Sequence, residues 1–130
     1  MNNLDGVILN IYQETSYNGK SVSNFVEEES IFIECDFTSA NIHGAVITDA
    51  IFIACNFSKA NLGLCTAFRT KFISCEFDST LFKGSNLESS VFINCNIKNC
   101  DFTSEASGGK GIFNDITTEG CTVEGTFPEE

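Results

Sequence analysis

The chain has 130 residues, 42% of them hydrophobic, and carries a formal net charge of −11. Its length predicts a single domain. The negative charge argues against direct nucleic-acid binding, because affinity for phosphate backbones comes from Lys and Arg. No apolar stretch is long enough to cross a bilayer, so we expect no membrane segment. The N-terminus lacks the basic flank and apolar run of an export signal, so we expect a cytoplasmic protein.

Residues 1–29 hold only fragments of the repeat that follows them. Tyr12, Tyr17 and Val22 are in phase with that repeat, whereas Phe25 is two residues out of phase. Terminal repeats are usually atypical, because one of their faces has no neighbour to pair with. We therefore expect 1–29 to form an N-terminal cap or degenerate coil. The acidic run 27–29 would be a solvated corner that also blunts the open edge.

Residues 30–104 repeat with a period of five. A large apolar residue stands at the centre of almost every unit, and a small residue stands two positions before it. The centres are Phe32, Phe37, Ile42, Ile47, Phe52, Phe57, Leu62, Phe72, Phe77, Phe82, Leu87, Phe92, Ile97 and Phe102. A helix would repeat its apolar face every 3.6 residues and a strand every 2, so neither explains this period. The pattern predicts an internal repeat whose nine phenylalanine centres form the core.

A second period of twenty contains the first. The segments 31–35, 51–55, 71–75 and 91–95 each place Phe second and Cys last. Four units of five per twenty residues predict a four-sided coil, and successive coils would stack as parallel ladders. Each side would point one large and one small residue inward.

The units resemble those of the pentapeptide repeat family, which read roughly Ala-Asp/Asn-Leu/Phe-X-X. The best matches are Ala40-Asn41-Ile42, Ala60-Asn61-Leu62, Cys35-Asp36-Phe37, Cys55-Asn56-Phe57 and Cys100-Asp101-Phe102. The resemblance covers residues 30–104 and implies an all-β fold, a right-handed quadrilateral β-helix of about four regular coils with irregular caps. Solenoids of one shape serve many partners, so the fold alone does not name a function.

We expect one domain over 1–130, with a loop and C-terminal cap over 105–130. One irregular place lies within the coils: Ala67 underfills its centre, and a local bulge could swing Phe68 inward. Gly44, Gly63 and Gly84 lie near one corner, where a turn with positive φ would favour glycine.

The seven cysteines form no recognisable metal or disulfide pattern. Cys35, Cys55, Cys75 and Cys95 would line up in one inward column with neighbours about 4.8 Å apart. Parallel Cβ vectors suit disulfide geometry poorly, and no histidine joins the column as a co-ligand. We interpret the cysteines as free, small, buried residues, and expect no metal or cofactor.

Residues that could support catalysis are scarce. His43 is the only histidine and should face solvent, because it follows an inward-pointing centre. The segment Gly108-Gly109-Lys110-Gly111 is glycine-rich, but no helix N-terminus is expected beside it to complete a phosphate site. We therefore predict no catalytic residues and no enzyme activity.

One side of the coil carries the clearest functional signal. Its outward positions are apolar and β-branched at seven of eight places, namely Ile31, Ile33, Ile51, Ile53, Ile73, Val91 and Ile93, with Lys71 the exception. The equivalent positions on the next side are polar or charged. High β-propensity alone could explain the stripe, but we favour an interface. The cover would be a second copy of the chain or, as an alternative, the chain's own segment 7–11.

We therefore expect a non-enzymatic protein-interaction or assembly module, and we favour a homodimer as its assembled form. The alternative is an inhibitor or protector of a type II topoisomerase such as DNA gyrase that mimics DNA, as the resemblance to quinolone-resistance members of the family implies. Against this alternative, residues 30–104 hold seven acids and five bases, so the coils themselves are nearly neutral. The tail 124–130 is also too short and too polar for an amphipathic helix, so we do not expect it to form the C-terminal dimerisation module of those members.

Overall fold

The structure is a computed structural model, and it describes residues 2–4 and 7–128. All its regular elements are strands of three residues. They are β1 (Asn2–Leu4), β2 (Val7–Leu9), β3 (Ile11–Gln13), β4 (Ile31–Ile33), β5 (Ile51–Ile53), β6 (Lys71–Ile73), β7 (Glu76–Asp78), β8 (Val91–Ile93), β9 (Asn96–Lys98), β10 (Thr117–Glu119) and β11 (Thr122–Glu124).

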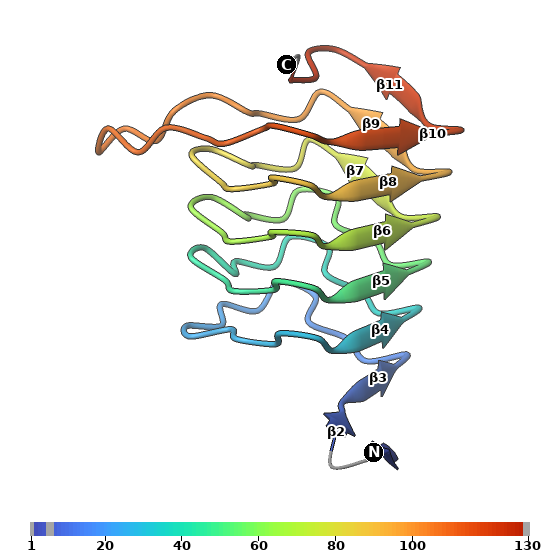
Figure 1. The fold of residues 1–130 in the computed structure, drawn as a ribbon. Coiled ribbons are helices and arrows are strands. Elements are labelled where there is room, and N and C mark those ends of the chain that lie inside the picture. Colours follow the sequence, from blue (N-terminus) through green and yellow to red (C-terminus); the bar gives the residue numbers. More distant parts are fainter. Residues whose placement is uncertain (1, 5–6, 129–130) are drawn as a thin grey trace.

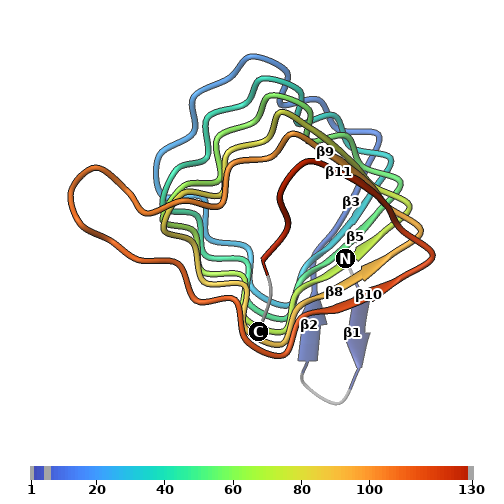
Figure 2. The same ribbon diagram turned by 90° about the horizontal axis from the view of Figure 1, so that it is seen from above.

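The chain winds into a stack of four-sided coils (Figures 1 and 2). Side one is a six-stranded parallel sheet in the order β10-β8-β6-β5-β4-β3, and side two contains β7, β9 and β11. Sides three and four are held by single parallel bridges, such as Asn41 with Asn61 and Val46 with Thr66. Neighbouring coils pair at an interval of twenty residues. The predicted fold class, a right-handed quadrilateral β-helix, is confirmed.

The corners explain why five residues make one side. The last residue of nearly every unit, two positions after the centre, adopts a left-handed backbone, with φ between 50° and 61° at non-glycine positions such as Glu34, Lys59 and Arg69. A non-glycine residue in this region costs of the order of 1 kcal/mol or more. The corner N–H groups offset part of this cost by bonding to the next coil, as when Glu34 donates to the Ile53 carbonyl at 2.8 Å.

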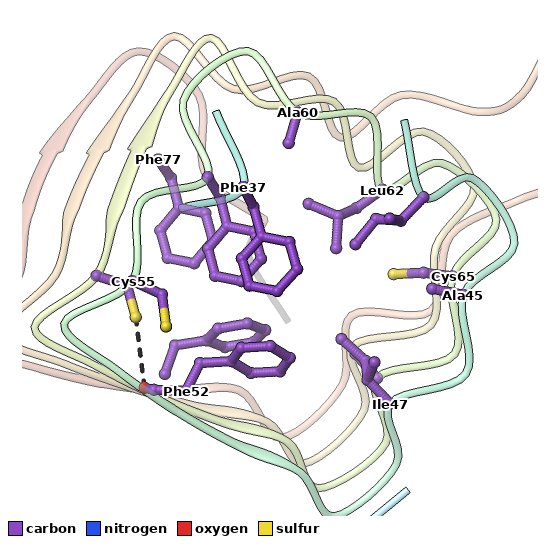
Figure 3. Packing of buried hydrophobic residues seen from close by; sticks show 14 of the residues in the cluster. Phe37, Ala45, Ile47, Phe52, Cys55, Ala60, Leu62, Cys65 and Phe77 are labelled. Atoms are coloured by element: carbon purple, nitrogen blue, oxygen red, sulfur yellow. Dashed lines mark hydrogen bonds between the residues drawn. The ribbon is translucent and has the colours of Figure 1, made fainter. Parts of the chain in front are cut away.

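The core contains stacked aromatic columns beside columns of aliphatic residues such as Ile47 and Leu62 (Figure 3). Phe32 and Phe52 stack with ring centroids 4.7 Å apart, and Phe37 and Phe57 stack at 4.8 Å. The predicted core phenylalanines are fully buried, except Phe102, which is half-buried near the end of the stack. Small polar residues beside them are satisfied internally: the Thr70 hydroxyl, for example, donates to the Ile47 carbonyl at 2.7 Å.

Asn and Asp side chains brace the outside of the units. In each of six units, the residue before the centre accepts a hydrogen bond through Oδ1 from the backbone N–H two positions on. These residues are Asp36, Asn41, Asn56, Asn61, Asn86 and Asp101. The side chain thereby fixes the bend that leads into the corner.

Residues 11–29 form a coil that pairs in register with the next one. Ser16, Ser21 and Val26 bridge to Asp36, Asn41 and Val46. The first coil differs in its inward residues, because Phe25 fills the small position and Glu27 takes the centre. The apparent phase change at Phe25 is thus a change of residue type within an unbroken register.

The N-terminal end closes over this altered coil. Tyr12 stacks on Phe32 at 4.8 Å, and its hydroxyl donates to Glu27 Oε1 at 2.9 Å. Ser30 Oγ donates to the same carboxylate oxygen at 3.1 Å. At the N-terminal end, the core is therefore closed by polar groups that hydrogen-bond to one another.

The C-terminal end leaves the twenty-residue interval. Asn86 pairs with Ile112 instead of residue 106, so the fifth coil contains six additional residues. The loop they form projects from the stack in Figure 2. After β11 the chain turns inward over the stack, and Phe127 packs edge-on against Phe92 and Phe102, with centroids 6.0 and 5.3 Å away.

The bulge expected at Ala67 is absent, so that prediction is wrong. Ala67 is buried and in register, and its N–H donates to the Asn86 carbonyl at 2.7 Å. Phe68 points outward, where the Arg69 guanidinium lies 4.3 Å from its ring centroid. The corner prediction holds for Gly44 and Gly84, whose φ values are 76° and 66°, but not for Gly63, because Leu64 occupies that corner with φ 52°.

Candidate interaction face

The isoleucine face is the outward surface of side one between β4 and β8. Ladder pairing aligns its residues in two columns: Ile31, Ile51, Lys71 and Val91 form one, and Ile33, Ile53, Ile73 and Ile93 form the other. Each apolar member is half-buried, because its neighbours above and below cover part of it, and Lys71 is exposed. The seven predicted interface residues thus lie together on one flat parallel surface.

The face continues toward the N-terminus but ends toward the C-terminus. On β3, Ile11 is 39% exposed and extends the first column. On β10, Thr117 and Glu119 replace the aliphatic residues beyond Val91 and Ile93. The apolar surface is therefore bounded by an acidic residue at one end.

Side two shows that such a stripe is not required for coil pairing. Its outward residues include Asp36, Asn56, Glu76 and Asn96, which form the same parallel ladder. Asn96 Nδ2 also donates to Glu76 Oε1. The β-helix therefore tolerates polar outward residues, and the apolar residues of side one are not explained by pairing alone.

Charged groups line one edge of the isoleucine face. Arg69 Nε donates to Asp49 Oδ1 at 2.8 Å and Nη2 donates to Oδ2 at 2.9 Å, a bidentate pair at the corner between sides four and one. The Arg69 hydrogen bond is the largest influence on Asp49 and lowers the pKa of its carboxyl, and Lys71 adds a smaller effect of the same sign. Asp49 is thus an anion beside the face, next to the cation of Lys71.

The N-terminal segment lies away from the face. β1 and β2 pair as an antiparallel hairpin, and Figure 1 shows this hairpin beyond β3 at the end of the stack. The side chains of Val7 and Ile8 lie outside the described residues. Placement of the hairpin does not support the alternative that segment 7–11 covers Ile33 to Ile93.

The histidine and the glycine-rich segment lie at the corner between sides three and four. His43 Nε2 is 3.9 Å from Glu105 Oε2. A Cβ on Gly63 would lie 3.0 Å from the His43 ring and 3.3 Å from the Glu105 carboxylate, and one on Gly84 would lie 2.8 Å from the Gly109 carbonyl. These glycines provide space for the loop to pack against the stack. Sequence reasoning missed this role because the loop's position could not be read from the register.

The cysteine column is built as expected. Cys55, Cys75 and Cys95 are buried and donate through Sγ to the carbonyls of Phe32, Phe52 and Phe72 at 3.3–3.5 Å (a bond of this kind is dashed in Figure 3). Burial raises the pKa of the Cys75 thiol well above its usual value. Burial likewise raises the pKa of the Cys65 thiol to about 12. Thiols in this state are poor nucleophiles.

Other candidate sites are weak. Within residues 2–4 and 7–128, no group of three His, Cys, Asp or Glu side chains is arranged to hold a metal ion. No helix in that part of the chain is long and apolar enough to cross a membrane. A hollow of about 490 Å³ opens at the C-terminal end of the stack, where Phe102, Phe113 and Pro128 line it. The hollow lies at the end of the stack, where no further complete coil covers the core.

A family model described as the SV2A/B/C luminal domain matches residues 11–102. The chain belongs to that family. The matched range spans the regular coils and the first coil with its altered core. The cytoplasmic location expected from the sequence is wrong, because a luminal domain family points to a non-cytoplasmic location. That expectation was based on the N-terminal residues and on the lack of a membrane-length apolar stretch, and a domain's fold does not record its compartment.

Solved structures agree with this fold, and pentapeptide repeat proteins are among them. The chain is similar to Rfr23 from the cyanobacterium Cyanothece 51142, with TM-score 0.68, 9% identity, and coverage of 86% of this chain and 90% of that one. A pentapeptide repeat protein of the Arabidopsis thaliana thylakoid lumen gives TM-score 0.67 and 19% identity, covering 72% of this chain and 65% of that one. At these identities the likeness establishes the fold alone. None of the curated proteins is significantly similar to this chain.

Full-length QnrB1, a plasmid-mediated fluoroquinolone resistance protein, also matches, with TM-score 0.37 and 13% identity over 85% of this chain and 92% of that one. A TM-score this low carries no argument about function.

Proposed function

We propose that this chain is a non-enzymatic protein-interaction module whose isoleucine face binds a second copy of the chain. The observation that carries the proposal is the row of seven aliphatic β-branched side chains on one flat side, whereas the adjoining side is polar. Apolar patches of this kind on soluble proteins commonly mark interaction sites. Support for a non-enzymatic role comes from the Cys65 and Cys75 thiols, whose pKa burial raises, and from the pentapeptide repeat proteins that share the fold.

Charge favours one orientation of the two copies. In an antiparallel pair, with the two-fold axis between β5 and β6, Lys71 would lie over the partner subunit's Ile51 and beside the partner subunit's Asp49. In a parallel pair, Lys71 would instead face the partner subunit's Ile73, which has no acid beside it. The antiparallel pair brings opposite charges together twice, because a two-fold interface repeats each contact.

The size of the face sets the strength of the association. With about 4.8 Å between strands and about 3.3 Å per residue, the four strands of the isoleucine face measure roughly 20 by 10 Å, or about 200 Å². Stable complexes bury about 800 Å² on each partner, so the isoleucine face alone supports a weak, concentration-dependent dimer. We expect a dissociation constant in the micromolar range or higher.

The test is sedimentation velocity over a range of concentrations. The double variant Ile53→Lys and Ile73→Lys should remain a folded monomer at concentrations where the wild type associates. The matched control, Ser58→Lys and Asp78→Lys, changes the equivalent positions of side two and should associate like the wild type. A wild type that stays monomeric at millimolar concentration would refute the homodimer, and equal loss in both variants would refute the choice of face.

Lys71 distinguishes the two orientations. Lys71→Ile should strengthen association, because it completes the apolar column. Lys71→Glu should weaken association more than Lys71→Gln does, because it would place like charges beside the partner subunit's Asp49. Equal effects of Glu and Gln would contradict the antiparallel arrangement.

We do not extend the proposal to topoisomerase inhibition. A protein that mimics duplex DNA needs a negatively charged shaft, and residues 30–104 carry nearly balanced charges. A supercoiling assay with DNA gyrase is the direct check, and inhibition at stoichiometric protein would revive that alternative.

A further inference from the structure

The cysteine column contains one thiol that differs from the others. Cys35, Cys55, Cys75, Cys95 and Cys121 occupy the same position in five successive coils, just after side one. The first four are buried, and Cys121 is half-exposed because it lies in the last coil of the stack. Only the C-terminal end of the column is therefore open to a reagent in solution.

Cys121 lies directly against Cys95. The register of β11 with β9 aligns Thr122 with Asn96, so the two cysteines that precede these residues are neighbours. Cys121 Sγ is 3.5 Å from the backbone nitrogen of Cys95. Paired parallel strands are about 4.8 Å apart, which falls within the Cα separation of a disulfide.

Cys121 precedes β11, the edge strand of its sheet, so a coil lies on one side of it only, whereas the inner cysteines have coils on both sides. Gly120 and Gly125 flank the last strand segment with φ values of 67° and 89°. The equivalent corners before the inner cysteines hold Glu34, Ala54, Ser74 and Asn94. Because glycine restricts the backbone less than these residues do, Cys121 has more freedom to leave the parallel geometry that disfavours a disulfide between stacked cysteines. The inner pairs share the spacing but lack both access and freedom.

We propose that Cys121 and Cys95 form an oxidisable thiol pair that reacts with small-molecule disulfides. The Cys121 thiolate attacks one sulfur of the small disulfide, and the first small thiolate leaves. The Cys95 thiolate then attacks the Cys121 sulfur of the mixed disulfide, and the second small thiolate leaves. The protein loses two protons and two electrons, and the reagent gains them as two thiols.

The product would tie the last coil to the one beneath it. Burial raises the pKa of the Cys121 thiol, so little thiolate is present near neutral pH and the first step is slow. Cys121 should therefore react before the six other cysteines because its thiol is accessible to the reagent, and not because its pKa is low. A non-cytoplasmic location, to which the luminal family points, is one where disulfides persist.

The test is to incubate the folded protein with oxidised glutathione and to map unreduced peptides by mass spectrometry. The wild type should acquire a Cys95–Cys121 cross-link. Cys95→Ser should instead accumulate glutathione on Cys121, because no second thiol is available to displace it. Cys121→Ser should form neither product, and Cys65→Ser should behave as the wild type. Circular dichroism confirms that each variant is folded, and serine is already tolerated at buried small positions such as Ser85 and Ser90.

Two results would overturn the inference. One is a wild type in which glutathione stays on Cys121 without a cross-link, since Cys95 would then be out of reach. The other is a folded protein in which Cys121 remains unmodified, or is modified no faster than the buried cysteines. The unfolded chain serves as the positive control, because it should react at every cysteine.

Discussion

The two ends of the stack close the same core by different means. At the N-terminal end the register is kept and the residues change: Tyr12 takes a Phe position, and Glu27 takes an aliphatic centre. At the C-terminal end a six-residue insertion breaks the twenty-residue interval, the ladders resume at β10 and β11, and a tail then places Phe127 across the core. A solenoid end can therefore be capped by substitution within a coil or by extra chain laid over it.

The difference has an energetic side. The N-terminal cap buries polar atoms that must find partners, and Tyr12, Ser30 and Glu27 supply them to one another. The C-terminal cap adds an apolar ring but orders additional chain, which costs conformational entropy. Both ends should be less stable than the coils between them.

The largest expected effect compares the shaft, meaning the regular coils of residues 30–104, with the C-terminal cap. Phe72→Ala should lower the free energy of unfolding by about 3 to 5 kcal/mol, because Phe72 is fully buried between Phe52 and Phe92 and the coils cannot collapse around the void. Phe127→Ala should cost only about 1 to 2 kcal/mol, since Phe127 is half-buried at an end. Urea denaturation measures both. Equal costs would mean that the tail is as integral to the core as the shaft.

The second prediction measures how firmly the inserted loop is docked. Gly44 and Gly84 have similar left-handed φ values, but only Gly84 contacts the loop. Gly44→Ala should cost about 1 kcal/mol through the backbone alone. Gly84→Ala should cost about 2 to 3 kcal/mol, because the new Cβ displaces Gly109 and Leu64.

Limited proteolysis at Lys110 provides an independent readout of the same contact. Cleavage should accelerate in Gly84→Ala and not in Gly44→Ala. If both variants lose equal stability and Lys110 is cleaved at the same rate in both, contacts of the loop with Gly84 do not stabilise the C-terminal end.

The smallest expected effect concerns the N-terminal cap. Burial, assisted by the hydrogen bond and charge of Glu27, raises the pKa of Tyr12 from 10.0 to about 12. The folded state thus prefers the protonated phenol, and this contribution to stability is complete below pH 10 and lost as pH rises toward 12. Tyr12→Phe should cost about 1 kcal/mol at neutral pH and should flatten the loss of stability at high pH.

Thermal unfolding at several alkaline pH values, together with ultraviolet titration of the phenols, checks this prediction. Tyr17→Phe is the matched comparison, because Tyr17 stacks on Phe37 at 4.7 Å and burial also raises its pKa, but the hydrogen bond to Glu27 belongs to Tyr12. The loss of stability at high pH should therefore flatten more in Tyr12→Phe than in Tyr17→Phe. An unchanged pH profile in Tyr12→Phe would contradict a role for Tyr12 in the cap.

The shaft could be predicted from sequence because nearly every unit obeys the same local rule. The centres from Phe32 to Ile97 take apolar side chains, and the position two before each centre has room only for a small one. Such a constraint repeats in the sequence at the interval at which it repeats in space. The outward apolar side of the coil follows from the same count, so the residues of the isoleucine face were predictable too.

The ends could not be predicted, because there the residue type no longer reports the position. Phe25 stands at a small position only because no coil lies beneath it to restrict its volume. The length of the insertion after Ser104 is not encoded in any repeat. Gly63 illustrates a third limit: it resembles its neighbours Gly44 and Gly84 in sequence, but it is required for space and not for a left-handed turn.

The twenty-residue interval makes the length of the molecule adjustable in discrete steps. Removing residues 51–70 would join two coils whose ladders already match, and duplicating them would insert one more layer of about 4.8 Å. Each added layer of this kind would also enlarge the isoleucine face by two aliphatic residues. Tandem duplication within a gene could thus tune the strength of self-association step by step, without any change to the chemistry of either end.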